Sequence, residues 1–297
     1  MSTSAEKMFE NKNTGTDPET VTSQEIDESF GRARANLMSL VQSPEFHQAC
    51  AEADVDPFDD TEVAYWQVMQ NQAEEVLDSA KDVGEMNETD YQTNRLVFAA
   101  PNYVMRQAEL EGGDSNPPQN RREAKVVASK FNDAMRDFAT AFPEVNASAL
   151  EVNLQNVVNE TMFEEEMIQA GSEYIKQSIR GARHEAAFGQ ILAQAGFNFR
   201  ETTIEEDLKG ADFMIETGDG EAPLDVKASL SDIEARGQEQ QPCTVKPDGT
   251  VVIYSHLLDS EFAGKLGISE DKAAEKAEIV APSLEEALNP DLRPAAV

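Results

Sequence analysis

Residues 210–229, "GADFMIETGDGEAPLDVKAS", contain two short segments of alternating apolar and polar residues on either side of a glycine-containing loop. Successive side chains of a β-strand point to opposite faces, so Phe213 and Ile215 share one face of the first segment. Leu224 and Val226 share one face of the second segment for the same reason. A hairpin that turns within "TGDGEA" brings these apolar faces together. The pattern therefore predicts a sheet with one face in a hydrophobic core.

The other face of this hairpin carries charged residues. Asp212 lies on the first strand, and Asp225 and Lys227 lie on the second. Depending on the strand register, Asp212 lies directly across from Asp225 or from Lys227. Either register clusters two carboxylates and one ammonium group on one side of the sheet.

A predicted helix, "HEAAFGQILAQAGF", precedes the hairpin and should end at Gly196, a residue suited to a helix C-terminus. Its apolar residues recur at helical spacing from Phe188 onward, and Glu185 lies three residues earlier, on the edge of that apolar stripe. We therefore expect Glu185 to point toward the place where the helix meets the sheet. His184 is expected at an exposed helix position.

These residues suit metal-dependent hydrolysis of phosphodiester bonds. Mg²⁺ prefers hard oxygen ligands, so we expect Asp212 and Asp225 to bind it, with the Val226 carbonyl as a further ligand. The ion would polarise a phosphate and lower the pKa of a bound water. Lys227 would steady the phosphate or orient the attacking water, and Glu185 would bind a second ion or hold the water network.

The order of Glu185 on a helix, Asp212 in "GAD" and then "DVK" at 225–227 resembles the PD-(D/E)xK nuclease superfamily, which has the restriction-endonuclease-like fold. The resemblance covers roughly residues 178–256, and Ala211 stands where the family name has proline. It implies an αβββ(α)β core with a mixed sheet and Mg²⁺-dependent cleavage of DNA, with Mn²⁺ as a substitute ion. The helix between the third and fourth strands would come from "SLSDIEARGQEQQPC".

The short pattern [DE]-x-K is not specific by itself. The chain contains five instances, which begin at Glu10, Glu123, Asp207, Asp225 and Glu270. The instance at Asp225 is the one on a predicted strand with an aspartate on the paired strand and a glutamate on a preceding helix. The specificity therefore comes from the combination of residues.

The chain has 24 Lys and Arg against 57 Asp and Glu, which gives a formal net charge of −33. Acidic disorder would require few apolar residues, whereas 40% of this chain is hydrophobic and the apolar positions are periodic. The composition favours a halophilic protein, because the Debye length in molar salt is about 3 Å and surface charges then scarcely repel one another. Counterion release contributes little to DNA binding in such a medium, so the acidic charge does not exclude DNA as a partner.

Cys50 and Cys243 are isolated and form neither a metal-binding spacing nor a disulfide framework. No apolar run approaches the roughly 18 residues of a membrane span. We therefore expect a cytoplasmic protein without a membrane-bound part. The sequence leaves open whether it forms a homodimer.

The N-terminal half predicts a different architecture. Residues 1–23 are expected to form a disordered tail, and residues 24–177 an all-α domain in which Pro101 ends or kinks a helix. The nuclease-like α/β domain would follow at 178–267, and an acidic helix and tail at 268–297. The segment "SALEVNLQNVVNETMFEEEMIQAGSEYIKQSIR" would form one long helix or two joined helices.

A locally basic segment at 121–136 lies within this helical half. Helical spacing places four cations on one face together with Ser129 and Asn132, and we expect these cations to contact the DNA backbone or to be salt-bridged to acidic neighbours. The four cations are Arg121, Arg122, Lys125 and Arg136.

Two functions from different classes remain open from the sequence. One is a Mg²⁺-dependent DNA endonuclease or exonuclease of restriction, repair, recombination or viral DNA processing. The other is a non-catalytic helical interaction or structural protein with an inactive nuclease-like module, in which Asp225 and Lys227 form a surface ion pair worth about 0–1 kcal/mol.

Overall fold

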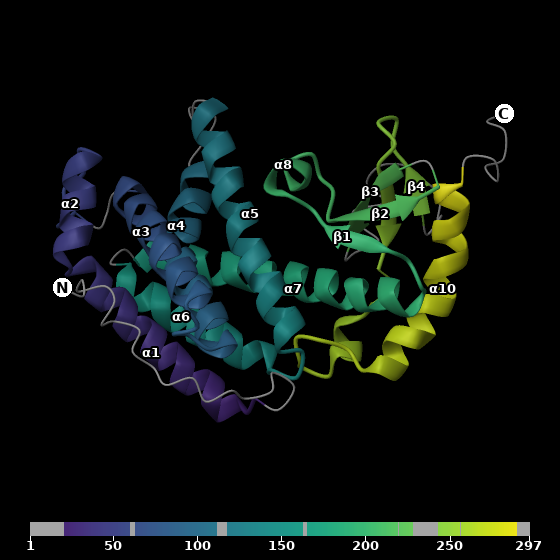
Figure 1. Cartoon of the computed structure of the whole chain (residues 1–297), viewed down its shortest axis with the longest axis horizontal. Helices are drawn as coiled ribbons and strands as arrows, with labels where there is room; N and C mark the ends of the chain where they lie inside the picture. The colour runs from purple at the N-terminus through teal and green to yellow at the C-terminus, as the bar shows by residue number, and fades with distance from the viewer. Residues whose placement is uncertain are drawn as a thin grey trace. The chain divides into compact units, whose positions relative to one another are not determined.

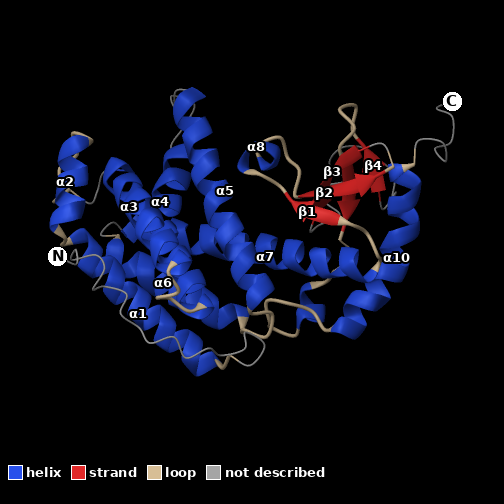
Figure 2. Ribbon diagram, in the orientation of Figure 1, coloured by secondary structure: helices blue, strands red, loops and turns tan. Residues whose placement is uncertain are grey.

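The structure is a computed structural model that describes residues 21–59, 63–111, 118–162, 165–218, 220–227, 243–255 and 257–289. The chain forms two compact units, a helical unit (Met1–Ile179) and a sheet unit (Arg180–Val297). The sheet unit contains a five-stranded mixed sheet, drawn in red in Figure 2. The predicted mixed α/β class with a helical N-terminal region is thus confirmed. The predicted tail at 1–23 lies outside the described residues except for its last three.

The helical unit is built around one central helix, α4 (Glu88–Glu111), in which almost every residue from Asp90 to Arg106 is buried. It packs against α1, α3, α5 and α6 (Figure 1). A helix that is covered on several sides must be apolar or internally hydrogen-bonded around its circumference. Each neighbouring helix covers it with one apolar face, and this explains the amphipathic pattern of these neighbours. The other helices of this unit are α1 (Ser23–Val41), α2 (Pro44–Glu52), α3 (Val63–Asp82), α5 (Pro118–Ala141), α6 (Ala147–Thr161) and the start of α7 (Glu165–Gln194).

Of the two outcomes predicted at Pro101, an end or a kink of the helix, the end is not observed. Helix α4 continues through Pro101 to Glu111. An interior proline removes one backbone hydrogen bond and costs about 3 kcal/mol. Burial of α4 against its neighbouring helices offsets this cost, and a reading of local sequence does not include that burial.

Helix α7 is continuous from Glu165, so the segment predicted as one long or two joined helices divides between α6 and α7. The predicted end at Gly196 is confirmed, because α7 ends at Gln194 and Gly196 has a φ of +79°. The Gly196 N–H donates to the Ala193 carbonyl at 3.1 Å, and the Phe197 N–H donates to the Leu192 carbonyl at 3.1 Å. This pair of hydrogen bonds is the Schellman termination of a helix.

The sheet of the second unit has the strand order β1-β2-β3-β5-β4. Strands β1, β2 and β3 are antiparallel, β3 and β5 are parallel, and β4 is antiparallel to β5. The three-residue strand β4 was not predicted, and the helix predicted from 229–243 lies outside the described residues except for Cys243. The strands are β1 (Phe199–Glu201), β2 (Phe213–Thr217), β3 (Gly220–Lys227), β4 (Cys243–Val245) and β5 (Val251–Tyr254).

The predicted apolar face of the hairpin is confirmed. Phe213 pairs with Leu224 in the β2–β3 register, and both are buried together with Ile215 and Val226. Helix α7 contributes Phe188 and its apolar neighbours to the same core. Helix α10 (Glu270–Leu288) contributes five buried residues to it, and this joins the acidic C-terminal stretch to the sheet unit. These five residues are Ala273, Ala277, Val280, Leu284 and Ala287.

Among the helices that the structure describes, none combines the length and the hydropathy that a membrane-spanning helix requires.

Candidate functional site

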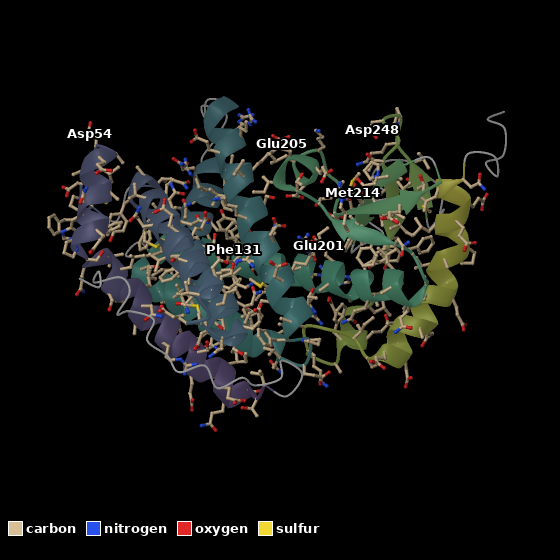
Figure 3. The ribbon with its side chains drawn as sticks, viewed as in Figure 1. Asp54, Phe131, Glu201, Glu205, Met214 and Asp248 are labelled. Atoms are coloured by element: carbon tan, nitrogen blue, oxygen red, sulfur yellow. The ribbon has the colours of Figure 1, made fainter. Side chains whose placement is uncertain are left out.

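Asp212 lies at the point where the β2–β3 ladder ends. Its backbone N–H donates to the Leu224 carbonyl at 2.7 Å, and its side-chain Oδ2 accepts from the Val226 N–H at 2.6 Å. The carboxylate thus occupies the position that the next ladder bond would take. Phe213 pairs with Leu224, and Asp212, one residue before this pair, is bonded to the backbone of Leu224 and Val226, the two residues that flank Asp225. In Figure 3, the label on Met214 marks the strand two residues beyond Asp212.

Asp225 lies on the face of β3 opposite to the hydrophobic core and is only 3% exposed. Lys227 forms an ion pair with its Oδ1. The Nζ of Lys246 lies 2.9 Å from its Oδ2. Each carboxylate oxygen of Asp225 is therefore paired with one ammonium group, Oδ1 with Lys227 and Oδ2 with Lys246.

Burial of the Asp212 carboxyl raises its pKa to about 7, and the negative charge of Asp225 adds to this effect, while the Val226 N–H and Lys227 oppose it. Asp212 keeps some exposed surface as a residue, yet its carboxyl is surrounded by protein. A cation bound beside Asp212 would lower this pKa.

The Val226 carbonyl points to the edge of β3 at which Asp212 lies. The N–H and C=O of one strand residue point to the same edge, and the Val226 N–H is the donor to Asp212. Because β2 begins at Phe213, no strand residue of β2 lies opposite Val226. The site thus offers one backbone and two carboxylate oxygen groups.

Glu185 is half-buried on α7, the helix that packs on the apolar face of the sheet. Asp225 and Lys227 lie on the other face. Within the described ranges, no three His, Cys, Asp or Glu side chains are grouped closely enough to hold one metal ion. The structure therefore brings together Asp212, Asp225, Lys227 and the Val226 backbone, and does not add Glu185 as a third carboxylate.

Lys246 is the member of the site that the sequence analysis missed. It directly follows β4 and begins a tight turn in which its N–H donates to the Thr250 carbonyl at 2.8 Å and the Gly249 N–H donates back to its carbonyl at 3.0 Å. Gly249 has a φ of +90°, which favours glycine at this position of the turn. In Figure 3, the label on Asp248 marks this turn. The available signal was a lysine beside a "PDG" turn in a lysine-poor chain.

Tyr254 is a second residue of this face that was not singled out. The parallel register pairs it with Lys227, and it is 9% exposed. Its neighbour on the same face, Val252, pairs with Asp225. An aromatic and an aliphatic side chain thus flank the two charged residues of β3.

The prediction that His184 is exposed is wrong, because His184 is 2% exposed. Its Nδ1 lies 3.2 Å from the Oγ of Ser255, and its Nε2 lies 3.7 Å from an oxygen of Asp259. Burial lowers the pKa of His184, against the opposing charge of Asp259. Ser255 is completely buried, so this group presents no accessible nucleophile.

The basic segment of α5 is only partly as predicted. Arg121, Arg122 and Lys125 are exposed, but Arg136 is 5% exposed and forms an ion pair with Asp133 at 3.0 Å. Ser129 is also buried. Of the two expectations for these cations, the salt bridge to an acidic neighbour is found for Arg136.

Comparisons of this chain with protein-family models, with curated proteins and with solved structures returned no match.

Proposed function

We propose that this chain is a Mg²⁺-dependent nuclease that hydrolyses the phosphodiester bonds of DNA, and that its sheet unit is a restriction-endonuclease-like core. The observation that supports the proposal is the proximity of Asp212 to Asp225: Asp212 is hydrogen-bonded to the backbone of the residues on either side of Asp225, and the Asp225 carboxylate forms an ion pair with Lys227. Two carboxylate ligands and one ammonium group would thus lie on the same face of the sheet.

The donor set fits a hard divalent cation. Mg²⁺ takes oxygen ligands in octahedral geometry and is often held by one or two carboxylates, with waters and phosphate oxygens in the other positions. Asp212, Asp225 and the Val226 carbonyl would supply the protein ligands. The pKa of Asp212 is raised first by burial and further by the charge of Asp225, and a bound cation would lower it. When bound, the ion would polarise the phosphate and lower the pKa of a bound water.

Lys227 has a distinct role in this proposal. Its side chain is 30% exposed, so its ammonium group can reach both Asp225 and a substrate at the surface. It would donate hydrogen bonds to a non-bridging phosphate oxygen or to the attacking water, and would thereby stabilise the negative charge that grows in the transition state. Glu185 is not among the ligands proposed for this ion.

One observation favours the rival function, a non-catalytic interaction or structural protein. Two ammonium groups already neutralise Asp225, so the site is electrically balanced without a metal ion. Buried ion pairs of this kind also occur in proteins for structural reasons. An activity measurement separates the two functions.

The test is Mg²⁺-dependent cleavage of plasmid and single-stranded DNA in molar KCl. We expect Asp225→Ala and Lys227→Ala each to lower the rate by about 10²–10³-fold, the range for loss of one group that stabilises transition-state charge. Glu216→Ala is the matched control, since Glu216 is an exposed carboxylate on β2. Cleavage that requires Mg²⁺ and is lost only in the two site variants supports the proposal. Equal activity in all four proteins would exclude this site as the catalytic one.

A further inference from the structure

Lys246 contacts Asp225 across an intervening strand. It follows β4, which is at the sheet edge, whereas Asp225 belongs to β3, and β5 lies between these two strands. The Nζ of Lys246 nevertheless lies 2.9 Å from the Asp225 Oδ2. The ammonium group also lies next to the loop that leads to Asp212, because a Cβ added to Gly210 would be 4.0 Å from it. Lys246 therefore places its charge between the two strands that carry the acids.

This position conflicts with metal binding unless one lysine moves. An ion bound by Asp225 needs one of its carboxylate oxygens, and both of these hold ammonium groups. Lys227 is on the same strand as Asp225. Lys246 belongs to a turn, and its side chain is 26% exposed, so it can leave Asp225 without disturbing the β3 ladder. Lys246 is thus the ammonium group that can be exchanged.

We propose that Lys246 is an exchangeable cation of this site: it neutralises Asp225 in the metal-free protein and, once a divalent cation takes the Asp225 oxygen, binds a phosphate of the substrate. The second half of this proposal rests on the proposed nuclease function, whereas the first half requires only that the site binds a metal ion.

The charges of the site support this exchange. Asp212 and Asp225 carry two negative charges when ionised, and Lys227 and Lys246 carry two positive charges. Addition of Mg²⁺ gives the site two excess positive charges within a chain whose formal net charge is −33. A phosphodiester carries one negative charge per linkage, so the metal-bound site would attract a nucleic acid strand in a chain that otherwise repels it.

The first experiment measures Mn²⁺ binding without DNA, by electron paramagnetic resonance in molar KCl. Lys246→Met removes a cation that competes with the metal. We expect it to bind Mn²⁺ about tenfold or more tightly than the wild type, since a charge-assisted hydrogen bond contributes roughly 1.5–3 kcal/mol. Lys246→Arg should stay close to the wild type because it retains the charge. Lys209→Met, a change at an exposed lysine next to Gly210, is the control for an equal change of net charge.

The second experiment measures cleavage kinetics of the same variants with Mg²⁺. Lys246→Met should raise the KM for DNA several-fold and lower kcat less, because it removes a phosphate contact and leaves Lys227 in place. Thermal unfolding of each variant checks that it is folded, and Lys246→Gln replaces Lys246→Met if the latter is not. Lys246→Arg should restore most of the DNA affinity.

The outcomes separate this inference from the proposed function. If Lys246→Met binds Mn²⁺ with wild-type or weaker affinity while the wild type cleaves DNA, the exchange is wrong and the nuclease function stands. If Mn²⁺ binding tightens as expected but the wild type does not cleave DNA, the exchange at Asp225 stands and the nuclease function fails. Tighter Mn²⁺ binding combined with a raised KM supports both.

Discussion

Each unit of this protein buries an aspartate together with cationic partners, and the two aspartates differ in what surrounds them. Asp90, in the first turn of α4, is 4% exposed and accepts hydrogen bonds from Ser29 Oγ at 2.6 Å, Arg32 Nη2 at 2.6 Å and Asn87 Nδ2 at 3.0 Å. Asp225 is 3% exposed and bound by Lys227 and Lys246. One carboxylate thus has mainly neutral donors and one cation, and the other has two cations.

The second difference is the neighbouring acid. Asp225 lies close to Asp212, whose pKa is raised to about 7 by burial and by the charge of Asp225. Asp90 instead lies in the first turn of a helix, where the helix dipole favours a negative charge. The helix dipole thus stabilises the charge of Asp90, whereas the charge of Asp225 opposes ionisation of the neighbouring Asp212. A buried carboxylate that faces a second carboxylate is therefore the better candidate for function.

Replacement of Asp90 should have the largest effect on stability. Asp90→Ala leaves Ser29 and Arg32 without their acceptor, and we expect the free energy of unfolding to fall by about 3 kcal/mol. The activity of the molecules that remain folded should be unchanged. Urea unfolding in molar KCl, together with the cleavage rate per folded molecule, tests this expectation. Asp225→Ala serves as the matched change and should lose activity per folded molecule, so an equal loss of activity per folded molecule in the two variants would contradict the comparison.

Asp212 should give the sheet unit a pH-dependent stability. Its pKa is raised in the folded protein from 3.8 to about 7, so its contribution to stability is complete below about pH 4 and is lost as the pH rises through 7. Relative to Asp212→Asn, the metal-free wild type should lose about 2–3 kcal/mol of unfolding free energy between pH 4 and pH 7.

Urea unfolding at several pH values measures this difference, and Glu216→Gln is the control for an exposed carboxylate. Saturating Mg²⁺ should shift the pH dependence of Asp212 to lower pH. A constant difference between the wild type and Asp212→Asn across this range would show that Asp212 does not titrate as described.

The exposed cations of α5 should have the smallest effect. Replacing Arg121, Arg122 and Lys125 by glutamine should raise the KM for DNA by less than about threefold in molar KCl, because screening is strong there. The slope of log affinity against log salt should decrease by up to about 3 if each cation contacts one phosphate. DNA binding measured between 0.5 M and 2 M KCl tests this, with Lys176→Gln, at an exposed position of α7, as the control. An unchanged slope would remove α5 from the DNA-binding surface.

The β2–β3 hairpin could be predicted because its alternation is strict and one face is apolar. Phe213, Ile215, Leu224 and Val226 fix the buried face, and this fixes which face carries Asp225 and Lys227. The register itself could not be chosen from the sequence, because both alternatives bury the same apolar residues.

Lys246 could not be predicted as part of the site because its contact depends on the order of three strands. The three-residue β4 has too few residues to show an alternation, and its place beside β5 is a tertiary feature. His184 was misplaced for a related reason. It is a polar residue whose burial is set by neighbouring elements, and helical periodicity assigns polar residues to the solvent side.

The central claim is that Asp212 and Asp225 share one divalent cation. Crystals soaked in Mn²⁺ test it most directly, since the anomalous scattering of Mn²⁺ locates the ion. We predict one ion bound by a carboxylate oxygen from each aspartate, at distances close to the roughly 2.0–2.1 Å of Mg²⁺ sites, with the Nζ of Lys246 no longer bonded to Asp225. An Asp225 carboxylate that still holds both lysines, with no ion beside Asp212, would contradict the account.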